Sequence, residues 1–448
     1  MIDAESRFLR RFFTLLKEAK VRYAVMRNWE SLPDSMGGSD LDLLSYDDNE
    51  AGVIADVAYE VAREFNGACT IRYKVEATIL CFAGRYDDGV WWGIHIDIFP
   101  GLLYFGIPYM KTDPVFEERV LVGDCFYRCG SLSDVASFVK EIMPNHRTKK
   151  DYYPRACQAY AANPENVKNA MIDCFGKSGW QVVKGLLEEQ RDAKRISADS
   201  KKMVRALWWR QISRLHWLSL VKIKSRNVYQ RLRRLFFKPG VAIAFLGTDG
   251  SGKSTLIENI KEPLERMLHS KIHYEHLRPN LLPYLAQLKG QKPTGKPCTD
   301  PHGGKVSGWL GSLIRFSYYY LDYIFGYWLK IYPILVKRPS MVFFDRYYYE
   351  YIIDPRRCAV KLPRGWAKFW GWFIPKPDLI LCLGGDPAKI YARKPETSLE
   401  EVTRQVKELK AFCERNRHAV WIDTTLSIEE SKNAALTAIT TFMSKSQK

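Results

Sequence analysis

Residues 247–255 read GTDGSGKST, a glycine-rich loop suited to binding phosphate. Its spacing satisfies G-x-x-x-x-G-K-[ST], with an apolar strand-like run before it and a helix-forming run after it. Glycines let the backbone wrap a phosphate with its N–H groups pointing inward, and a helix N-terminus adds positive charge. We therefore expect ATP and Mg²⁺ to bind here, on the residues Gly247, Asp249, Gly250, Ser251, Gly252, Lys253, Ser254 and Thr255.

Side chains in and after this loop have the types that phosphoryl transfer needs. Lys253 is expected to reach the β- and γ-phosphates, and the Ser254 hydroxyl to bind Mg²⁺. The run MVFFDRYYYEY (341–351) predicts a strand that ends at Asp345 and Arg346, and parallel sheets carry their chemistry at the carboxyl ends of strands. Asp345 could bind the metal or take a proton from the acceptor, and Arg346 could hold a phosphate. A surface ion pair is the alternative.

A further strand, DLILCLGG (378–385), precedes a predicted lid helix that carries Arg393 and Lys394. Cations on such a lid could cover the phosphates during transfer, exclude water and stabilise charge. The alternative is a solvated helix face.

Together these motifs make residues 241–445 resemble the thymidylate kinase family. The matching residues are FLGTDGSGKST, DRY at 345–347 and the DP…ARKPE run that includes Arg393. The resemblance implies that Asp249 lies on the acceptor side, that the DRY acid and arginine serve the metal and the acceptor phosphate, and that the lid cations contact the donor. It also implies a homodimer.

The sequence departs from that family where the acceptor would bind. Leu246 replaces the usual Glu before the first glycine, HLRPN (276–280) replaces R-E-P-G-G-T, and the residues after DRY that hold thymine are absent. The chain is more similar to the thymidylate-kinase-like proteins found with bacterial surface-polysaccharide genes. We expect an anionic or glycan acceptor, with Arg278, Arg356 and Arg357 as the candidates for holding it.

A second constellation, GGSDLDLL (37–44), places two carboxylates two residues apart on a predicted strand, where both point to one face. Such a pair can share divalent metals, and a third acid is available in GIHIDIFPG (93–101). A Gly-Gly-Ser turn can cradle a triphosphate, so the pattern suits two-metal nucleotidyl transfer. The expected metal ligands and catalytic groups are Asp40, Asp42 and Asp97, and the expected nucleotide cradle is Gly38 and Ser39.

On these residues, roughly 5–150 resemble the polymerase-β-like nucleotidyltransferase superfamily. A degenerate domain that only binds ligands is the alternative. His95 lies two residues before Asp97 on the same predicted strand face, and we expect it to be structural.

Residues 201–238 contain twelve Lys or Arg and no Asp or Glu, with apolar residues and Trp at near-helical spacing. A basic amphipathic helix of this kind can lie in a membrane interface. A pair of linker helices with a solvated basic face is the alternative. No recognisable nucleic-acid-binding fold accompanies the charge, so we expect no nucleic-acid partner.

The length of 448 residues predicts two or three domains, and the net charge of +18 favours anionic partners. Ten scattered Cys and an N-terminus without a signal-peptide pattern predict a cytoplasmic protein, peripheral at the inner face of the cytoplasmic membrane if the basic segment binds lipid. We expect an α/β protein: a mixed-sheet nucleotidyltransferase-like α+β domain (1–150), a helical extension (151–200), a basic linker (201–239) and a P-loop kinase with a parallel sheet flanked by helices (240–448).

The favoured function is an ATP- and Mg²⁺-dependent kinase that acts on a sugar, sugar phosphate or lipid-linked glycan terminus in surface-polysaccharide synthesis. The appended nucleotidyltransferase fold would serve the same pathway. Two alternatives stay open: nucleotidyl transfer as the main activity, and an ATP-responsive, membrane-associated scaffold with a degenerate N-terminal domain.

Overall fold

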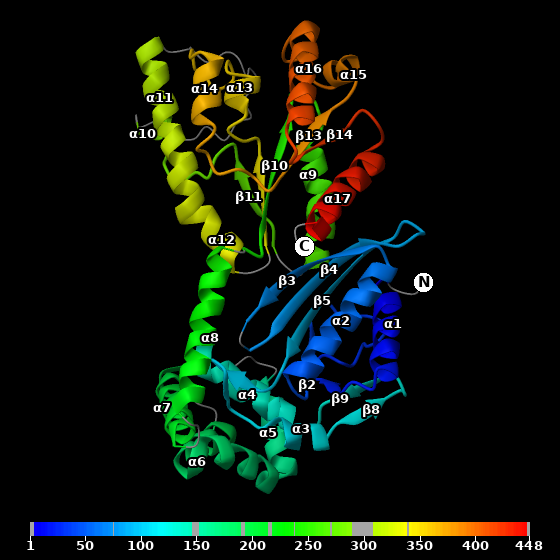
Figure 1. Ribbon diagram of the computed structural model, residues 1–448, viewed down its shortest axis with the longest axis vertical. Helices are drawn as coiled ribbons and strands as arrows, with labels where there is room; N and C mark the ends of the chain where they lie inside the picture. Colours follow the sequence, from blue (N-terminus) through cyan, green and yellow to red (C-terminus); the bar gives the residue numbers. More distant parts are fainter. Residues whose placement is uncertain are drawn as a thin grey trace. The chain divides into compact units, whose positions relative to one another are not determined.

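The computed structural model describes residues 4–74, 76–145, 152–189, 193–213, 217–236, 238–268, 271–288, 308–337 and 340–445. The chain divides into two compact units, Met1–Phe236 and Phe237–Lys448 (Figure 1). The helical extension and most of the basic segment belong to unit 1. Residues 290–305, whose Gly, Pro and Lys content predicts a loop, lie outside the described residues. None of the described helices combines the length and apolar character needed to cross a membrane.

Unit 1 joins a mixed sheet to a helical region. In chain order its elements are α1 (Ala4–Glu18), β1 (Tyr23–Val25), β2 (Leu41–Ser45), α2 (Asp48–Glu64), β3 (Gly67–Tyr73), β4 (Thr78–Arg85), β5 (Trp91–Phe99), β6 (Leu103–Tyr104), β7 (Ile107–Pro108), α3 (Thr112–Glu117), β8 (Val120–Val122), β9 (Phe126–Arg128), α4 (Leu132–Asn145), α5 (Tyr152–Ala162), α6 (Pro164–Glu188), α7 (Ala193–Ile212) and α8 (Trp217–Phe236).

The sheet of unit 1 has the strand order β3-β4-β5-β2-β1-β9-β8. β2 runs parallel to β5 and antiparallel to β1. The apolar stripe of α1, which includes Phe8 and Phe12, packs with α2 on one face of the sheet, where it meets inward-facing residues such as Leu43 and Ile96. A second cluster joins the other face to α3–α7. The predicted mixed sheet is therefore present, and it positions the two acid-bearing strands side by side.

Unit 2 contains a parallel sheet and a long helical arm that includes a π-helix. In chain order its elements are β10 (Val241–Gly247), α9 (Lys253–Leu268), β11 (His273–His276), α10 (Leu285–Leu288), α11 (Trp309–Leu321), η1 (Asp322–Ile331), α12 (Tyr332–Lys337), β12 (Met341–Asp345), α13 (Glu350–Ile353), α14 (Arg364–Trp370), β13 (Leu379–Gly384), α15 (Pro387–Arg393), α16 (Leu399–Arg415), β14 (Ala419–Asp423) and α17 (Ile428–Lys445).

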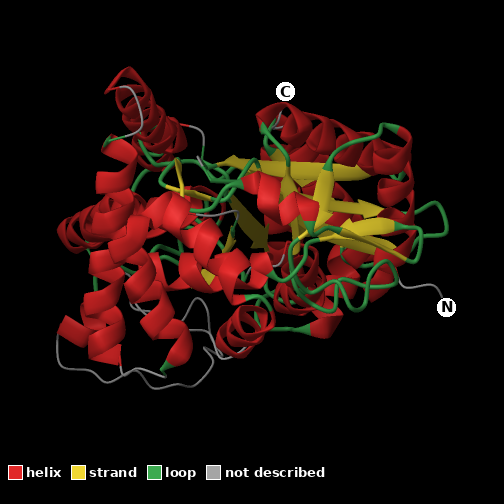
Figure 2. Ribbon diagram, turned by 90° about the horizontal axis from the view of Figure 1, so that it is seen from below, coloured by secondary structure: helices red, strands yellow, loops and turns green. Residues whose placement is uncertain are grey.

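The sheet of unit 2 has the order β11-β12-β10-β13-β14, and every pair in it is parallel. One face is covered by η1, α13 and α16 through a core that includes Tyr323 and Tyr347. α9 and α17 pack together on the side away from α11 (Figure 1). In the described part of the chain, helices make up more of the ribbon than strands do (Figure 2). The expected α/β class is confirmed, and the expected parallel C-terminal sheet is present.

Candidate functional site

The glycine-rich loop lies at the carboxyl end of β10 and leads into α9, which begins at Lys253. β10 is the middle strand, with β12 on one side and β13 on the other. The loop therefore lies where the chain switches between the two halves of the sheet, the usual place for a ligand in such sheets. Gly250 and Gly252 have φ angles of 79° and 74°. A Cβ on Gly250 would lie 2.8 Å from the Ile390 carbonyl oxygen, so this conformation requires glycine.

Hydroxyl groups in the loop are available to a ligand. Those of Thr248 and Ser251 are buried and have no hydrogen-bond partner among the described residues. Ser254 and Thr255 are exposed in the first turn of α9. A buried donor without a partner is costly unless a ligand supplies one. The loop, its unpaired hydroxyls and the helix N-terminus together fit the phosphates of a nucleotide and its Mg²⁺.

Lys253 is held inside the loop beside the carboxylate that ends β12. The residue is 7% exposed, and its Nζ lies 3.7 Å from Asp345 Oδ1. Burial lowers the pKa of Lys253, and the neighbouring Arg346 lowers it further, to about 8. Bound phosphates would reverse this effect, because their negative charge favours the ammonium form.

Asp345 ends β12 in register with Phe245 of β10. Its Oδ2 accepts a hydrogen bond of 2.8 Å from the Tyr274 hydroxyl and lies 3.6 Å from His276 Nδ1. Burial opposes ionisation, but His276, Lys253 and Tyr274 outweigh it and lower the pKa of Asp345 well below its usual value. The Oδ1 atom is buried and makes no hydrogen bond in the described structure. Lys253 Nζ lies 3.7 Å from this oxygen, beyond hydrogen-bond distance, so the oxygen could bind a metal ion or a water bound to one.

Arg346 connects the DRY motif to the loop. It is 4% exposed and has a φ of 73°, unusual for a residue other than glycine. Its Nη2 donates to Asp249 Oδ1 at 2.7 Å, and its Nη1 donates to Glu350 Oε2 at 3.0 Å and to the Gly247 carbonyl oxygen at 3.3 Å. Arg357 also donates to Asp249. Burial would raise the pKa of Asp249, but the two arginines outweigh it and lower the pKa.

The predicted lid residues lie against the loop. Arg393 Nη1 donates to the Thr424 carbonyl oxygen at 2.8 Å, and it lies 3.9 Å from the place where a Cβ on Gly252 would be. Lys394 forms an ion pair with Glu396 at 2.9 Å. A pocket of about 240 Å³ opens beside them, lined by Gly252, Thr255, Leu256, Arg393, Thr424, Leu426, Ile428 and Ser431.

The three predicted acceptor-binding arginines lie in different surroundings. Arg278 is 1% exposed and paired with the fully buried Asp322 of η1, so its charge already neutralises a carboxylate in the interior. Arg357 lies beside the loop on Asp249. Arg356 is exposed. Arg357 and Arg356 are therefore better placed than Arg278 to meet an acceptor.

In unit 1 the structure rearranges the predicted metal site. Asp42 lies in register with Asp97 on the parallel strands β2 and β5. Arg27 takes the Asp42 carboxylate, however, with an Nη2–Oδ1 distance of 3.0 Å and a second bond from Nε. Asp42 is therefore not part of the cluster of possible metal ligands. Asp40, His95 and Asp97 form the cluster instead, with ligand atoms all within 4.8 Å of one another.

His95 bridges the other two members of this cluster. Its Nδ1 lies 3.3 Å from Asp40 Oδ1, and its Nε2 lies 2.9 Å from Asp97 Oδ1. Burial would lower the pKa of His95, but its hydrogen bonds to Asp97 and Cys81 raise it to about 11. His95 was expected to be structural, and the structure places it between the Asp40 and Asp97 carboxylates. An imidazolium between two carboxylates and a three-ligand metal site both fit this geometry.

The turn before β2 contains the expected nucleotide cradle. Gly37 and Gly38 have φ angles of 62° and 75°. A Cβ on Gly38 would meet nothing within 4 Å, so glycine is needed there for conformation rather than for space. The Ser39 hydroxyl donates to the Met36 carbonyl oxygen at 3.2 Å, which closes the turn.

Comparisons with known proteins give a limited result. No protein-family model matches the sequence, and no curated protein matches it. Among solved structures, the chain is similar to the thymidylate kinase from Ehrlichia chaffeensis. The identity is 15% and the TM-score 0.31, over 45% of this chain and 98% of that one. A TM-score this low does not establish a shared fold, so the assignment of unit 2 rests on its own geometry.

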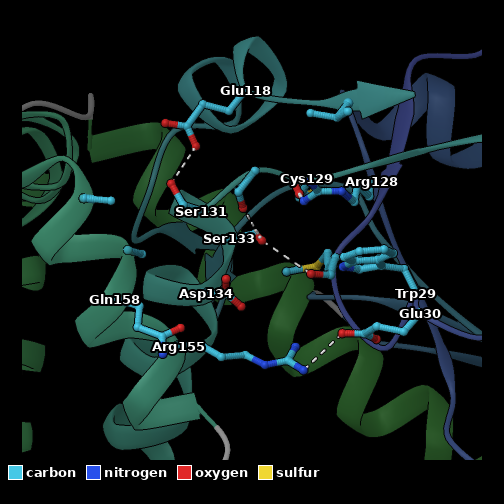
Figure 3. Close-up of a pocket in the computed structure, with 15 residues that line it drawn as sticks. Trp29, Glu30, Glu118, Arg128, Cys129, Ser131, Ser133, Asp134, Arg155 and Gln158 are labelled. Carbon is cyan, nitrogen blue, oxygen red and sulfur yellow. Dashed lines mark hydrogen bonds and ion pairs between the residues drawn. The ribbon is translucent and has the colours of Figure 1, made fainter. Parts of the chain in front are cut away.

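Unit 1 also contains a pocket of about 750 Å³, lined in part by charged side chains, beside the end of β1 (Figure 3). Arg155 donates to Glu30 across it at 3.2 Å, and the Arg128 guanidinium lies 4.6 Å from the centre of the Trp29 ring. Asp134 points into the space between these groups, and burial raises its pKa (Figure 3). Glu118 accepts hydrogen bonds from Ser131 and Asn166, so several of the polar groups that line the pocket already have protein partners, and we assign the pocket no ligand.

Several residues of both sites were absent from the sequence prediction. Arg27 holds Asp42, and Tyr274 and His276 hold Asp345. The run HYEH (273–276) before HLRPN was the available signal, because alternate polar residues on a short strand next to the DRY strand can reach its last carboxylate. No comparable signal pointed to Arg27.

Proposed function

We propose that unit 2 is a P-loop kinase that transfers the γ-phosphoryl group of ATP to an acceptor oxygen with the help of Mg²⁺. The observation that supports this most is the pair Lys253 and Asp345, 3.7 Å apart beneath a glycine loop whose buried hydroxyls have no described partner. The lysine would neutralise phosphate charge, and the Asp345 Oδ1 atom, which makes no hydrogen bond in the described structure, could bind the metal. Mg²⁺, when bound, neutralises the charge on the transferred phosphate.

In the proposed reaction, a bond forms between the acceptor oxygen and the γ-phosphorus. The bond from that phosphorus to the β–γ bridging oxygen breaks at the same time, and ADP leaves. Where the acceptor is a hydroxyl, its proton passes to solvent water. Asp249 and Asp345 both have lowered pKa values, so each is an anion that holds cations in place rather than a strong base. The residues of the chain then act by positioning and by charge neutralisation, which is the main requirement of phosphoryl transfer.

For the acceptor we propose a sugar, a sugar phosphate or a lipid-linked glycan terminus of bacterial surface-polysaccharide synthesis. Support comes from the exposed Arg356 and from Arg357, which reaches the Asp249 carboxylate. A net charge of +18 also favours an anionic acceptor. The sequence after DRY lacks the residues expected to hold thymine.

The test follows two labels in parallel. The full chain is incubated with Mg²⁺ and with ATP labelled at either the γ- or the α-phosphate, and a membrane and soluble glycan extract supplies acceptors. We expect γ-label to move, Lys253→Met to abolish the transfer, and Lys407→Met, at an exposed lysine of α16, to retain it. Transfer of γ-label that survives Lys253→Met would refute the proposal.

A second candidate function is nucleotidyl transfer by unit 1. It is favoured by the three ligand atoms of Asp40, His95 and Asp97, which could hold a divalent cation. In the same experiment this function predicts movement of α-label and release of pyrophosphate, both stopped by Asp40→Ala/Asp97→Ala and unaffected by Lys253→Met. Absence of α-label transfer with every nucleoside triphosphate tried would remove it.

A further inference from the structure

The last helix of unit 1, α8, has an apolar face exposed along its whole length. Seven of its residues are between 50% and 80% exposed. At about 100° per residue they fall within about 120° of the helix circumference. We name this surface the apolar arc; its residues are Leu218, Val221, Val228, Tyr229, Leu232, Leu235 and Phe236.

The opposite face of α8 packs on unit 1. Ile223 joins the core cluster of that unit, and the Asn227 side chain donates to the Phe105 carbonyl oxygen at 2.9 Å. Arg226 Nη1 lies 3.6 Å from an oxygen of Asp48. The rotation of the helix about its own axis is therefore set by these contacts, and they direct the apolar arc away from the body of unit 1.

The charged residues of α8 are all basic, which distinguishes it from a helix that presents only an apolar face to a partner protein. Residues 217–236 contain six Lys or Arg and no Asp or Glu. The exposed Lys222 borders the apolar arc on one side of the helix, and the exposed Lys224 borders it on the other, with its Nζ 6.0 Å from the centre of the Trp208 ring. The exposed Arg233, on the same side of the helix as Lys222, has its guanidinium 4.9 Å from the centre of the Tyr73 ring. Long cationic side chains at the borders of an apolar stripe suit an anionic lipid surface, where the apolar residues enter the acyl boundary and the cations meet the phosphates.

We propose that α8 docks the protein on the surface of an anionic membrane, with the apolar arc in the lipid and the flanking cations among the headgroups. The helix lies in the plane of the surface, because cations recur along its length. Docking of this kind is independent of the kinase chemistry proposed for unit 2. It would bring the protein to lipid-linked acceptors.

The test is flotation of the full chain with vesicles of phosphatidylcholine, with and without phosphatidylglycerol. We expect wild-type protein to float with the anionic vesicles and to be released by salt, because screening weakens the attraction. Val228→Glu/Leu232→Glu should lower the vesicle-bound to free ratio at least about tenfold, equivalent to about 1.4 kcal/mol. The matched control is Val120→Glu/Leu121→Glu on β8, which adds the same charge at two exposed apolar residues and should float like the wild type.

A second variant separates charge from apolar contact. Lys222→Gln/Lys224→Gln keeps the apolar arc and should weaken binding to anionic vesicles about fivefold for each cation removed. Failure of the wild type to float, or equal flotation of both α8 variants and the wild type, would overturn the proposal. Two results for Val228→Glu/Leu232→Glu would also overturn it. If the variant melts at a lower temperature and the wild type does not float, the chain itself covers the apolar arc. If the wild type self-associates without lipid and the variant does not, the apolar arc binds a second copy of the chain.

Discussion

Lys253→Met should stabilise the folded protein in the absence of nucleotide while it abolishes phosphoryl transfer. Burial and Arg346 lower the pKa of Lys253 from 10.5 to about 8, a value that already includes the attraction of Asp345 and Asp249. Since each pKa unit corresponds to about 1.4 kcal/mol, the charge on Lys253 disfavours the folded state by about 3 kcal/mol. Methionine has a similar length and carries no charge, so the substitution removes this penalty.

The stability difference between Lys253→Met and the wild type should depend on pH in a definite direction. Below about pH 8 the lysine is charged in both folded and unfolded chains, and the full penalty is present. Between pH 8 and 10.5 the folded chain loses its proton first, so wild-type stability rises in this window relative to the variant. The stability gained by Lys253→Met should therefore be largest near neutral pH and should shrink towards pH 10.5.

The assay is urea denaturation of the full chain near pH 7 and near pH 10, followed by fluorescence. Lys407→Met is the control, because its lysine is exposed. Mg-ATP at about a hundred times its Kd should stabilise the wild type by about 2.7 kcal/mol and stabilise Lys253→Met much less. If Lys253→Met is no more stable than Lys407→Met near pH 7, the lysine is not desolvated and the reasoning is wrong.

Three further predictions follow from contacts in unit 2. Arg346→Met should lower the free energy of unfolding by about 3–5 kcal/mol, because it leaves the buried Glu350 without its cation. Arg346→Met/Glu350→Gln should recover part of this loss in urea denaturation. If the losses of the two single variants simply add in the double variant, the pairing is contradicted. Gly250→Ala should weaken ATP binding in equilibrium titration at least tenfold, because its Cβ would lie 2.8 Å from a carbonyl oxygen; Gly365→Ala, where a Cβ meets nothing within 4 Å, should bind normally. Asp345→Asn should reduce kcat about a hundredfold to a thousandfold and raise the Mg²⁺ concentration needed for half-maximal rate; an unchanged Mg²⁺ requirement would exclude a metal role.

Local motifs carried most of what could be predicted for unit 2. The glycine loop was foreseeable because only glycine accepts the φ angles of Gly250 and Gly252, so the spacing itself encodes the shape. Asp345 was foreseeable because it directly follows an apolar run that forms the strand beside β10. In both cases the information lies within about ten residues of the site.

Partners brought in from distant segments could not be predicted in the same way. Tyr152, which also binds Arg27, comes from α5 and lies 125 positions along the chain from it. Arg278 was predicted to face an acceptor, yet its charge pairs with Asp322. Asp322 lies on a π-helix, which the spacing of apolar residues in the sequence did not predict. A side chain's charge state and availability depend on such tertiary partners, and a sequence pattern alone does not contain them.

The two carboxylate clusters differ in what a metal ion would meet. In unit 1, Arg27 neutralises Asp42, and His95 bridges Asp40 and Asp97, so a divalent cation must compete with cationic side chains that already satisfy these acids. In unit 2, the buried Oδ1 atom of Asp345 makes no hydrogen bond in the described structure, although Lys253 Nζ lies 3.7 Å from it, and the lowered pKa keeps the carboxylate ionised at neutral pH. A metal that binds there loses no existing hydrogen bond from that oxygen. Titration with Mn²⁺ should therefore show a site removed by Asp345→Asn at lower metal concentration than any site removed by Asp40→Ala, and the reverse order would move the main activity to unit 1.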